Sequence, residues 1–116
     1  MKVIRVYSGE DGESHLEEVG LAYQPIADAE VTAMRGASGI QFRHSPPGQF
    51  IDWHPAPARQ YVIILQGQSK ITVGDGSSHT FGVGDVLFAD DLTGRGHTTE
   101  VVSDEPRVSI FVPLTD

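Results

Sequence analysis

Three side chains in this sequence, His54, Gln60 and His97, carry atoms that could act together on a small molecule. His54 precedes a proline-rich kink, Gln60 begins the strongest apolar run, and His97 follows the glycine-rich segment 94–96. Neutral imidazoles suit divalent Fe, Mn, Ni, Cu or Zn, and an amide oxygen can join such a set without adding charge. If all three point into one cavity, they predict a metal site. The alternative is a pair of histidines that only form hydrogen bonds in a polar cavity.

Carboxylates near these residues offer a second kind of chemistry. Asp90 and Asp91 precede His97 by a short loop, and a carboxylate can fix the tautomer of an imidazole and raise its basicity. His97 and Asp91 are therefore the predicted catalytic pair, although ordinary turn residues also place aspartates here. Asp52, two residues before His54, either adds a carboxylate ligand or is a solvated strand end.

Arg43, Arg59 and Arg95 lie close in sequence to the segments that carry these groups. Arginine binds carboxylates through two parallel hydrogen bonds, so the three residues are candidates for recognising an anionic substrate. The competing interpretation is ordinary ion pairing with the surplus of Asp and Glu on the surface, which is the more frequent role.

The elements that must position these groups are short strands. Thirteen glycines and seven prolines separate brief apolar segments, which is the pattern of an all-β sandwich or barrel in a single domain. Segment 8–18 is polar and acidic and predicts a loop or at most one helical turn. Segment 21–34 holds two short apolar pieces, one of which is expected to be a strand covering the barrel. The predicted strands are 3–7, 39–44, 50–54, 60–65, 70–73, 79–81, 86–89, 98–102 and 108–112.

Two of these strands carry further expectations. Ile40, Phe42 and His44 share one side of their segment and are expected to face inward, which makes His44 a reserve ligand. The run from Tyr61 to Leu65 is apolar without a break and therefore predicts cover on both faces. In so small a barrel the outer cover is most simply a second subunit, so a homodimer is expected.

Composition excludes several classes of function. The chain has 116 residues, 16 acidic against 8 basic, and a net charge of −8, which disfavours binding to nucleic acid. No apolar run approaches the roughly 20 residues of a membrane span. Because there are no cysteines, disulfides, thiolate metal sites and cysteine nucleophiles are absent. A cytoplasmic location is the default expectation.

The spacing of the first motif resembles the cupin superfamily, whose members are small jelly-roll barrels of the RmlC-like type. Gly48 is followed by five residues and His54, and Gly67 closes the motif in register. Ala56 stands where the family's second histidine belongs, and Gln60 stands where its glutamate belongs. Two of the usual metal ligands are therefore replaced.

The second motif spans 84–97. Gly84 opens it, Asp90 takes the place of the family's proline, and Gly94 and His97 close it after an insertion of two residues. The resemblance covers about residues 39–112 and implies a cupin-type jelly roll, and the whole chain 1–116 is expected to form this single domain.

The resemblance also implies a small polar or anionic ligand inside the barrel, since cupins include dioxygenases, isomerases and lyases that act with a divalent metal. The replaced ligands Ala56 and Gln60 instead favour a metal-free binding or sensing module. A third alternative is metal-free acid–base catalysis by His97 with Asp91, similar to sugar epimerases of this fold.

Overall fold

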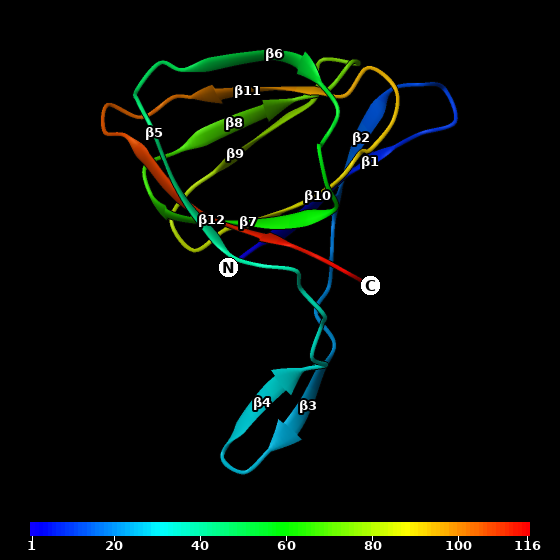
Figure 1. Cartoon of the computed structure of the whole chain (residues 1–116), viewed down its shortest axis with the longest axis vertical. Helices are drawn as coiled ribbons and strands as arrows, with labels where there is room; N and C mark the ends of the chain where they lie inside the picture. Colours follow the sequence, from blue (N-terminus) through cyan, green and yellow to red (C-terminus); the bar gives the residue numbers. More distant parts are fainter.

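The computed structural model describes all 116 residues and contains twelve strands and no helix, so no helix is available to span a membrane (Figure 1). The strands are β1 (Val3–Ser8), β2 (Ser14–Glu18), β3 (Tyr23–Ile26), β4 (Ala29–Thr32), β5 (Gln41–Ser45), β6 (Phe50–His54), β7 (Gln60–Gln66), β8 (Ser69–Thr72), β9 (Ser78–Phe81), β10 (Val86–Asp90), β11 (His97–Val101) and β12 (Arg107–Pro113). The predicted all-β class is confirmed.

Two sheets face each other and form the jelly roll. One has six strands in the order β2-β1-β10-β7-β12-β5, and the other has four in the order β6-β11-β8-β9. All neighbours in these sheets are antiparallel except β1 and β10, which run parallel. Within these two sheets, tight turns join only the consecutive pairs β1–β2 and β8–β9, and the other neighbouring strands come from segments that are distant in sequence.

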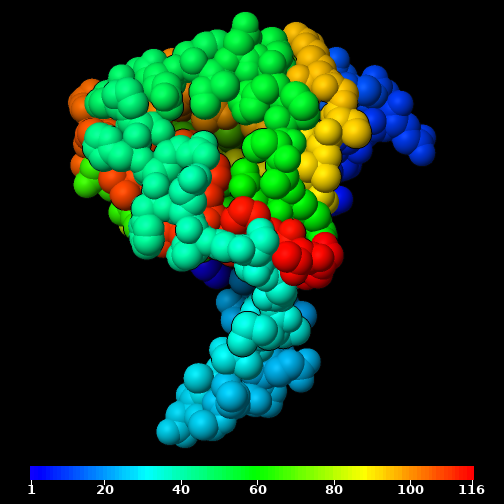
Figure 2. All heavy atoms as spheres, viewed as in Figure 1, coloured from blue at the N-terminus to red at the C-terminus, as the bar shows by residue number.

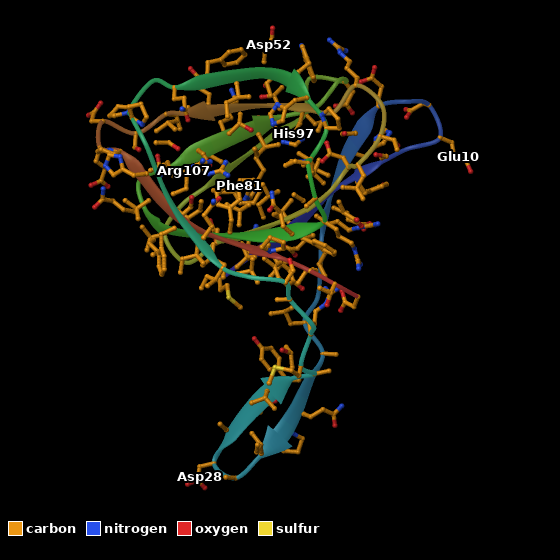
Figure 3. The ribbon with its side chains drawn as sticks, in the orientation of Figure 1. Glu10, Asp28, Asp52, Phe81, His97 and Arg107 are labelled. Atoms are coloured by element: carbon orange, nitrogen blue, oxygen red, sulfur yellow. The ribbon has the colours of Figure 1, made fainter.

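The core lies between the two sheets, where alternate residues of facing strands meet. Val6, Ile64, Ile71, Val73 and Phe81 are each at most 1% exposed, and Figure 3 shows Phe81 inside the barrel. Each fully buried side chain of this size stabilises the fold by about 1.5–3 kcal/mol relative to an exposed one. The same alternation fixes which side chains of β7, β8 and β10 line the cavity described below.

Residues 21–34 do form strands, but these strands do not cover the barrel, so that part of the expectation was wrong. β3 and β4 pair only with each other, as a two-stranded sheet, and Figures 1 and 2 show this hairpin projecting away from the body of the molecule. All residues of both strands are exposed. Their apolar side chains are too few, and Pro25 lacks the N–H that a barrel strand would need.

Segment 8–18 also differs from its expectation, because Ser14–Glu18 forms strand β2 and not a loop. This strand lies at the edge of the six-stranded sheet, where it pairs antiparallel with β1. An edge strand with one face in solvent can be polar, so composition alone concealed it.

The expected facing of β5 is reversed. Ile40 and Phe42 are 64% and 70% exposed, His44 is exposed, and the alternate residues Arg43 and Ser45 face the interior. The reason is the register with β12, which places Arg43 opposite the fully buried Ser109 and stacks its guanidinium 3.8 Å above the ring of Phe111. His44 is therefore not available as a reserve ligand.

Candidate functional site

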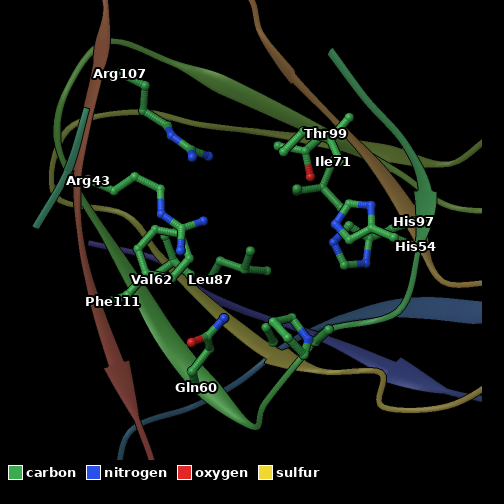
Figure 4. Close-up of a pocket in the computed structure, with 14 residues that line it drawn as sticks. Arg43, His54, Gln60, Val62, Ile71, Leu87, His97, Thr99, Arg107 and Phe111 are labelled. Carbon is green, nitrogen blue, oxygen red and sulfur yellow. The ribbon is translucent and has the colours of Figure 1, made fainter. Parts of the chain in front are cut away.

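One end of the barrel interior holds a cavity of about 200 Å³ between the two sheets (Figure 4). Its floor is apolar, with Val62 from β7, Ile71 from β8 and Leu87 from β10. Polar groups converge on the cavity from the surrounding strands: Arg43, His54, Gln60, His97, Thr99 and Arg107. An apolar enclosure with a few convergent polar groups is the usual form of a small-molecule site.

His54 and His97 lie together in the cavity wall, as the sequence predicts. They occupy directly paired positions on β6 and β11, and their ring centroids are 4.6 Å apart with the planes tilted by 55°. Gly96 permits this approach, since its φ is +82° and a Cβ there would overlap the carbonyl group of His54. Any larger residue at position 96 would push apart the backbones that carry the two imidazoles.

A chain of buried hydrogen bonds orients His97 from the side of the ring that faces away from the cavity. Asp91 follows β10 directly and is fully buried, and its Oδ2 accepts a hydrogen bond from Nδ1 of His97 at 2.6 Å. The same oxygen accepts a second bond from the hydroxyl of Ser14, also at 2.6 Å. Because the carboxylate accepts from Nδ1–H, the neutral imidazole of His97 has its lone pair on Nε2, which bonds to no other protein group. The predicted contact between His97 and Asp91 is present.

His54 is oriented by the backbone. Its Nδ1 lies 2.7 Å from the carbonyl oxygen of Asp52, and since a carbonyl can only accept, Nδ1 carries the proton and Nε2 the lone pair. The carboxylate of Asp52 accepts from the N–H of Trp53 on the exposed side of the strand. It therefore does not join the imidazoles.

Asp90 and two of the three candidate arginines lie outside the cavity. Asp90 forms ion pairs with Arg5 at 2.7 Å and with Arg59 at 3.2 Å. Arg95 stacks 3.8 Å above the ring of Trp53 and pairs with Glu13. Arg59 and Arg95 therefore have the ion-pairing role of the alternative interpretation, whereas Asp90 lies in strand β10 and not in a turn. Only Arg43 of the three arginines lines the cavity.

The structure adds one residue that sequence reasoning missed, Arg107. It is 4% exposed and lines the cavity; its Nη2 is 3.3 Å from the hydroxyl of Ser45, and its Nε has no partner. Burial, and then the like charge of Arg43, lowers the pKa of Arg107 below its ordinary value. The alternation of side chains along the strand could have identified Arg107, because it shares a strand face with Ser109 and Phe111, which are both buried.

Residues 35–103 match the family model described as the EutQ-like cupin domain. The chain belongs to the EutQ-like cupins. The matched segment contains both imidazoles, Gln60 and Asp91. Ser14 and Arg107 of this cupin lie outside it.

Solved structures share the fold of this cupin at low sequence identity. A conserved protein of unknown function from Streptococcus pyogenes aligns with a TM-score of 0.52 at 21% identity, over 73% of this chain and 70% of that one. An RmlC-like cupin family protein with a double-stranded β-helix fold from Methanocaldococcus jannaschii aligns with a TM-score of 0.53 at 16% identity, over 83% and 91%. The predicted RmlC-like jelly roll is confirmed. No protein of curated function matches the sequence.

The cavity of this cupin offers too few donors for a divalent cation. His54 and His97 supply two nitrogens, but Gln60 enters from the start of β7 and its amide lies apart from both imidazoles in Figure 4. No group of three or more His, Cys, Asp or Glu side chains in the protein could hold an ion. Two guanidinium groups line the same cavity and repel a cation. The side chains present therefore do not fit a resident metal, and the structure gives no support to the metal site predicted for His54, Gln60 and His97.

Proposed function

We propose that this cupin binds a small molecule inside its barrel and that His97, oriented by Asp91, exchanges a proton with it without a metal. The observation that carries the proposal is the buried chain from Ser14 through Asp91 to His97, which ends at the cavity. A carboxylate behind an imidazole fixes the tautomer and stabilises the imidazolium that forms when Nε2 takes a proton. The apolar floor strengthens this electrostatic effect by excluding water.

The proposed proton transfer conserves all atoms and electrons. Nε2 of His97 takes a proton from a carbon next to a carbonyl group, and the electron pair of that C–H bond moves onto the carbonyl oxygen as an enolate. The imidazolium then returns a proton to the same carbon. In D2O the returned particle is a deuteron, because the nitrogen exchanges with solvent between the two steps.

Exchange of carbon-bound hydrogen in D2O therefore tests the proposal, with sodium pyruvate and acetone as probes followed by proton NMR. We expect the protein to accelerate loss of the methyl signal, and His97→Gln to lower the rate about 100-fold, the usual contribution of a positioned acid or base. Asp91→Asn is expected to lower it too. His15→Gln, the same change outside the cavity, is the matched control. Equal rates for His97→Gln and His15→Gln would contradict the proposal.

We also propose that two barrels associate through the outer face of the six-stranded sheet. Tyr61 and Ile63 of β7 face outward there, and with Leu21, Tyr23, Val31 and Met34 they line a groove of about 540 Å³ beside the projecting hairpin. A hairpin of two four-residue strands is only marginally stable alone. A second copy laid over this groove would bury the apolar side chains of both elements.

A further inference from the structure

Two of the six arginines in this chain differ from the rest in lacking a carboxylate partner. Arg5, Arg35, Arg59 and Arg95 each lie within 4.0 Å of an acidic group. Arg43 and Arg107 form no ion pair, although the chain has 16 acidic residues against 8 basic ones. Both unpaired guanidinium groups line the barrel cavity. Among so many carboxylates, this pairing pattern points to a counter-ion that the protein does not itself provide.

The lack of a counter-ion is clearest at Arg107. Its side chain is 4% exposed, its Nε is buried without a partner, and its one hydrogen bond is to the Ser45 hydroxyl. A buried charge is strongly unfavourable unless an opposite charge or several hydrogen bonds compensate it. An anion in the cavity would supply both.

Arg43 brings a second positive charge to the same end of the cavity. Its guanidinium carbon lies over the ring of Phe111, 3.8 Å from the ring centroid, and Nη2 donates one hydrogen bond to Oε1 of Gln41. Contact with the ring holds the guanidinium in place and leaves further N–H groups free to donate. Figure 4 shows Arg43 and Arg107 pointing into the cavity from one side, with His54 and His97 on the other.

We propose that Arg43 and Arg107 bind the carboxylate of a small organic acid whose other end faces His54 and His97. The proposal deepens the proposed function and rests on it for the chemistry at the far end. A planar carboxylate matches two guanidinium edges. Phosphate fits less well, because its further oxygens would meet the apolar side chains of Val62, Leu87 and Phe111.

The cavity limits the size of this acid. Its volume of about 200 Å³ equals roughly seven water molecules at about 30 Å³ each. It is smaller than the roughly 300–1,000 Å³ of sites for drug-sized ligands. An acid of a few carbon atoms therefore fits, with its carboxylate at the arginines and its second or third carbon at the imidazoles.

Isothermal titration calorimetry tests the assignment with sodium propionate, sodium pyruvate, propionamide and inorganic phosphate. We expect both carboxylates to bind at one site per chain and the neutral amide at least tenfold more weakly. Arg107→Met and Arg43→Gln are each expected to weaken propionate binding at least tenfold. Arg95→Gln removes the same charge outside the cavity and is expected to stay within twofold of the unaltered protein.

The proposal is overturned if propionamide binds as well as propionate, if phosphate binds more tightly than both carboxylates, or if neither carboxylate binds. Unchanged binding by both cavity variants also overturns it. Because Arg43 is exposed, its variant remains informative if Arg107→Met fails to fold. Hydrogen exchange on acetone without carboxylate binding would remove this inference alone. Carboxylate binding without exchange would remove the proton transfer alone.

Discussion

His54 and His97 face each other across neighbouring strands at directly paired positions, with their ring centroids 4.6 Å apart. Each ring is held through Nδ1 by an oxygen outside the cavity, the carbonyl of Asp52 for one and the carboxylate of Asp91 for the other. Two adjacent imidazoles thus carry lone pairs on Nε2. This arrangement can accept protons at one end of a cavity whose other end is positively charged.

Purified protein is expected to contain far less than one transition metal ion per chain, because two imidazoles without a carboxylate form a weak site beside two guanidinium groups. Element analysis by mass spectrometry, before and after incubation with Zn²⁺, Mn²⁺ or Ni²⁺ and gel filtration, measures this. A stoichiometric ion that is lost in His97→Ala would instead support the metal-assisted alternative.

Ser14→Ala is expected to destabilise the protein by about 1–3 kcal/mol, because it removes a hydrogen bond from the buried carboxylate of Asp91. Urea denaturation followed by circular dichroism measures the change in the free energy of unfolding. Ser78→Ala, at an exposed position of β9, provides the matched control and is expected to change it by less than about 0.5 kcal/mol. Similar values for both variants would show that the carboxylate does not depend on Ser14.

Arg107→Met is expected to raise the free energy of unfolding by about 1–3 kcal/mol, because it replaces a buried, unpaired charge with an apolar side chain that matches the stem of arginine. Gain of stability with loss of carboxylate binding would mark Arg107 as a residue kept for recognition. The comparison is Arg95→Met on the surface, where a change within about 1 kcal/mol is expected. Marked destabilisation by Arg107→Met would show that the guanidinium has a structural role.

Asp85 is expected to make the protein less stable in acid. Partial burial raises the pKa of this carboxyl group, but hydrogen bonds from the backbone N–H groups of Gly82 and Lys2 outweigh it and hold the pKa below 3.8. A group whose folded pKa is depressed stabilises the fold above its unfolded pKa, and this stabilisation is lost as pH falls through the folded value. The stability difference between the unaltered protein and Asp85→Asn should therefore shrink from pH 5 to pH 2, as urea titrations at several pH values can measure.

Sedimentation velocity at micromolar concentration is expected to show a dimer that Ile63→Asp converts to monomer. The introduced charge would be buried in the apolar groove between β7 and the projecting hairpin, where no partner could neutralise it. Val83→Asp places the same charge on an exposed turn residue and is expected to leave the dimer intact. A monomeric unaltered protein would remove the proposed interface, and circular dichroism would verify that both variants fold.

Local signals in the sequence were sufficient to predict most strands of the barrel. Short segments rich in apolar residues and bounded by glycine or proline turns predict β6 at its observed bounds and β7 and β10 within one residue, because these strands end at turn residues. The approach of His54 and His97 and the contact of His97 with Asp91 also agree with the motif spacing. The fold and the histidine end of the cavity could therefore be predicted from the sequence.

The features that escaped prediction depend on non-local pairing. The inward facing of Arg43 and the place of Arg107 follow from the register of β5 with β12, whose residues are more than 60 apart in sequence. The polar strand β2 forms because it pairs with β1 at the edge of the six-stranded sheet. Gln60 does line the cavity, yet position in a motif could not show that its amide lies away from the imidazoles.

The arginine end of the cavity draws on two parts of the chain. Arg43 and the imidazoles belong to the segment 35–103 that matches the family model, whereas Arg107 begins β12 beyond that segment. The proposed carboxylate recognition and the proposed proton transfer are therefore separable by engineering. Exchange of both Arg43 and Arg107 for neutral residues would open the same pair of histidines to uncharged ligands.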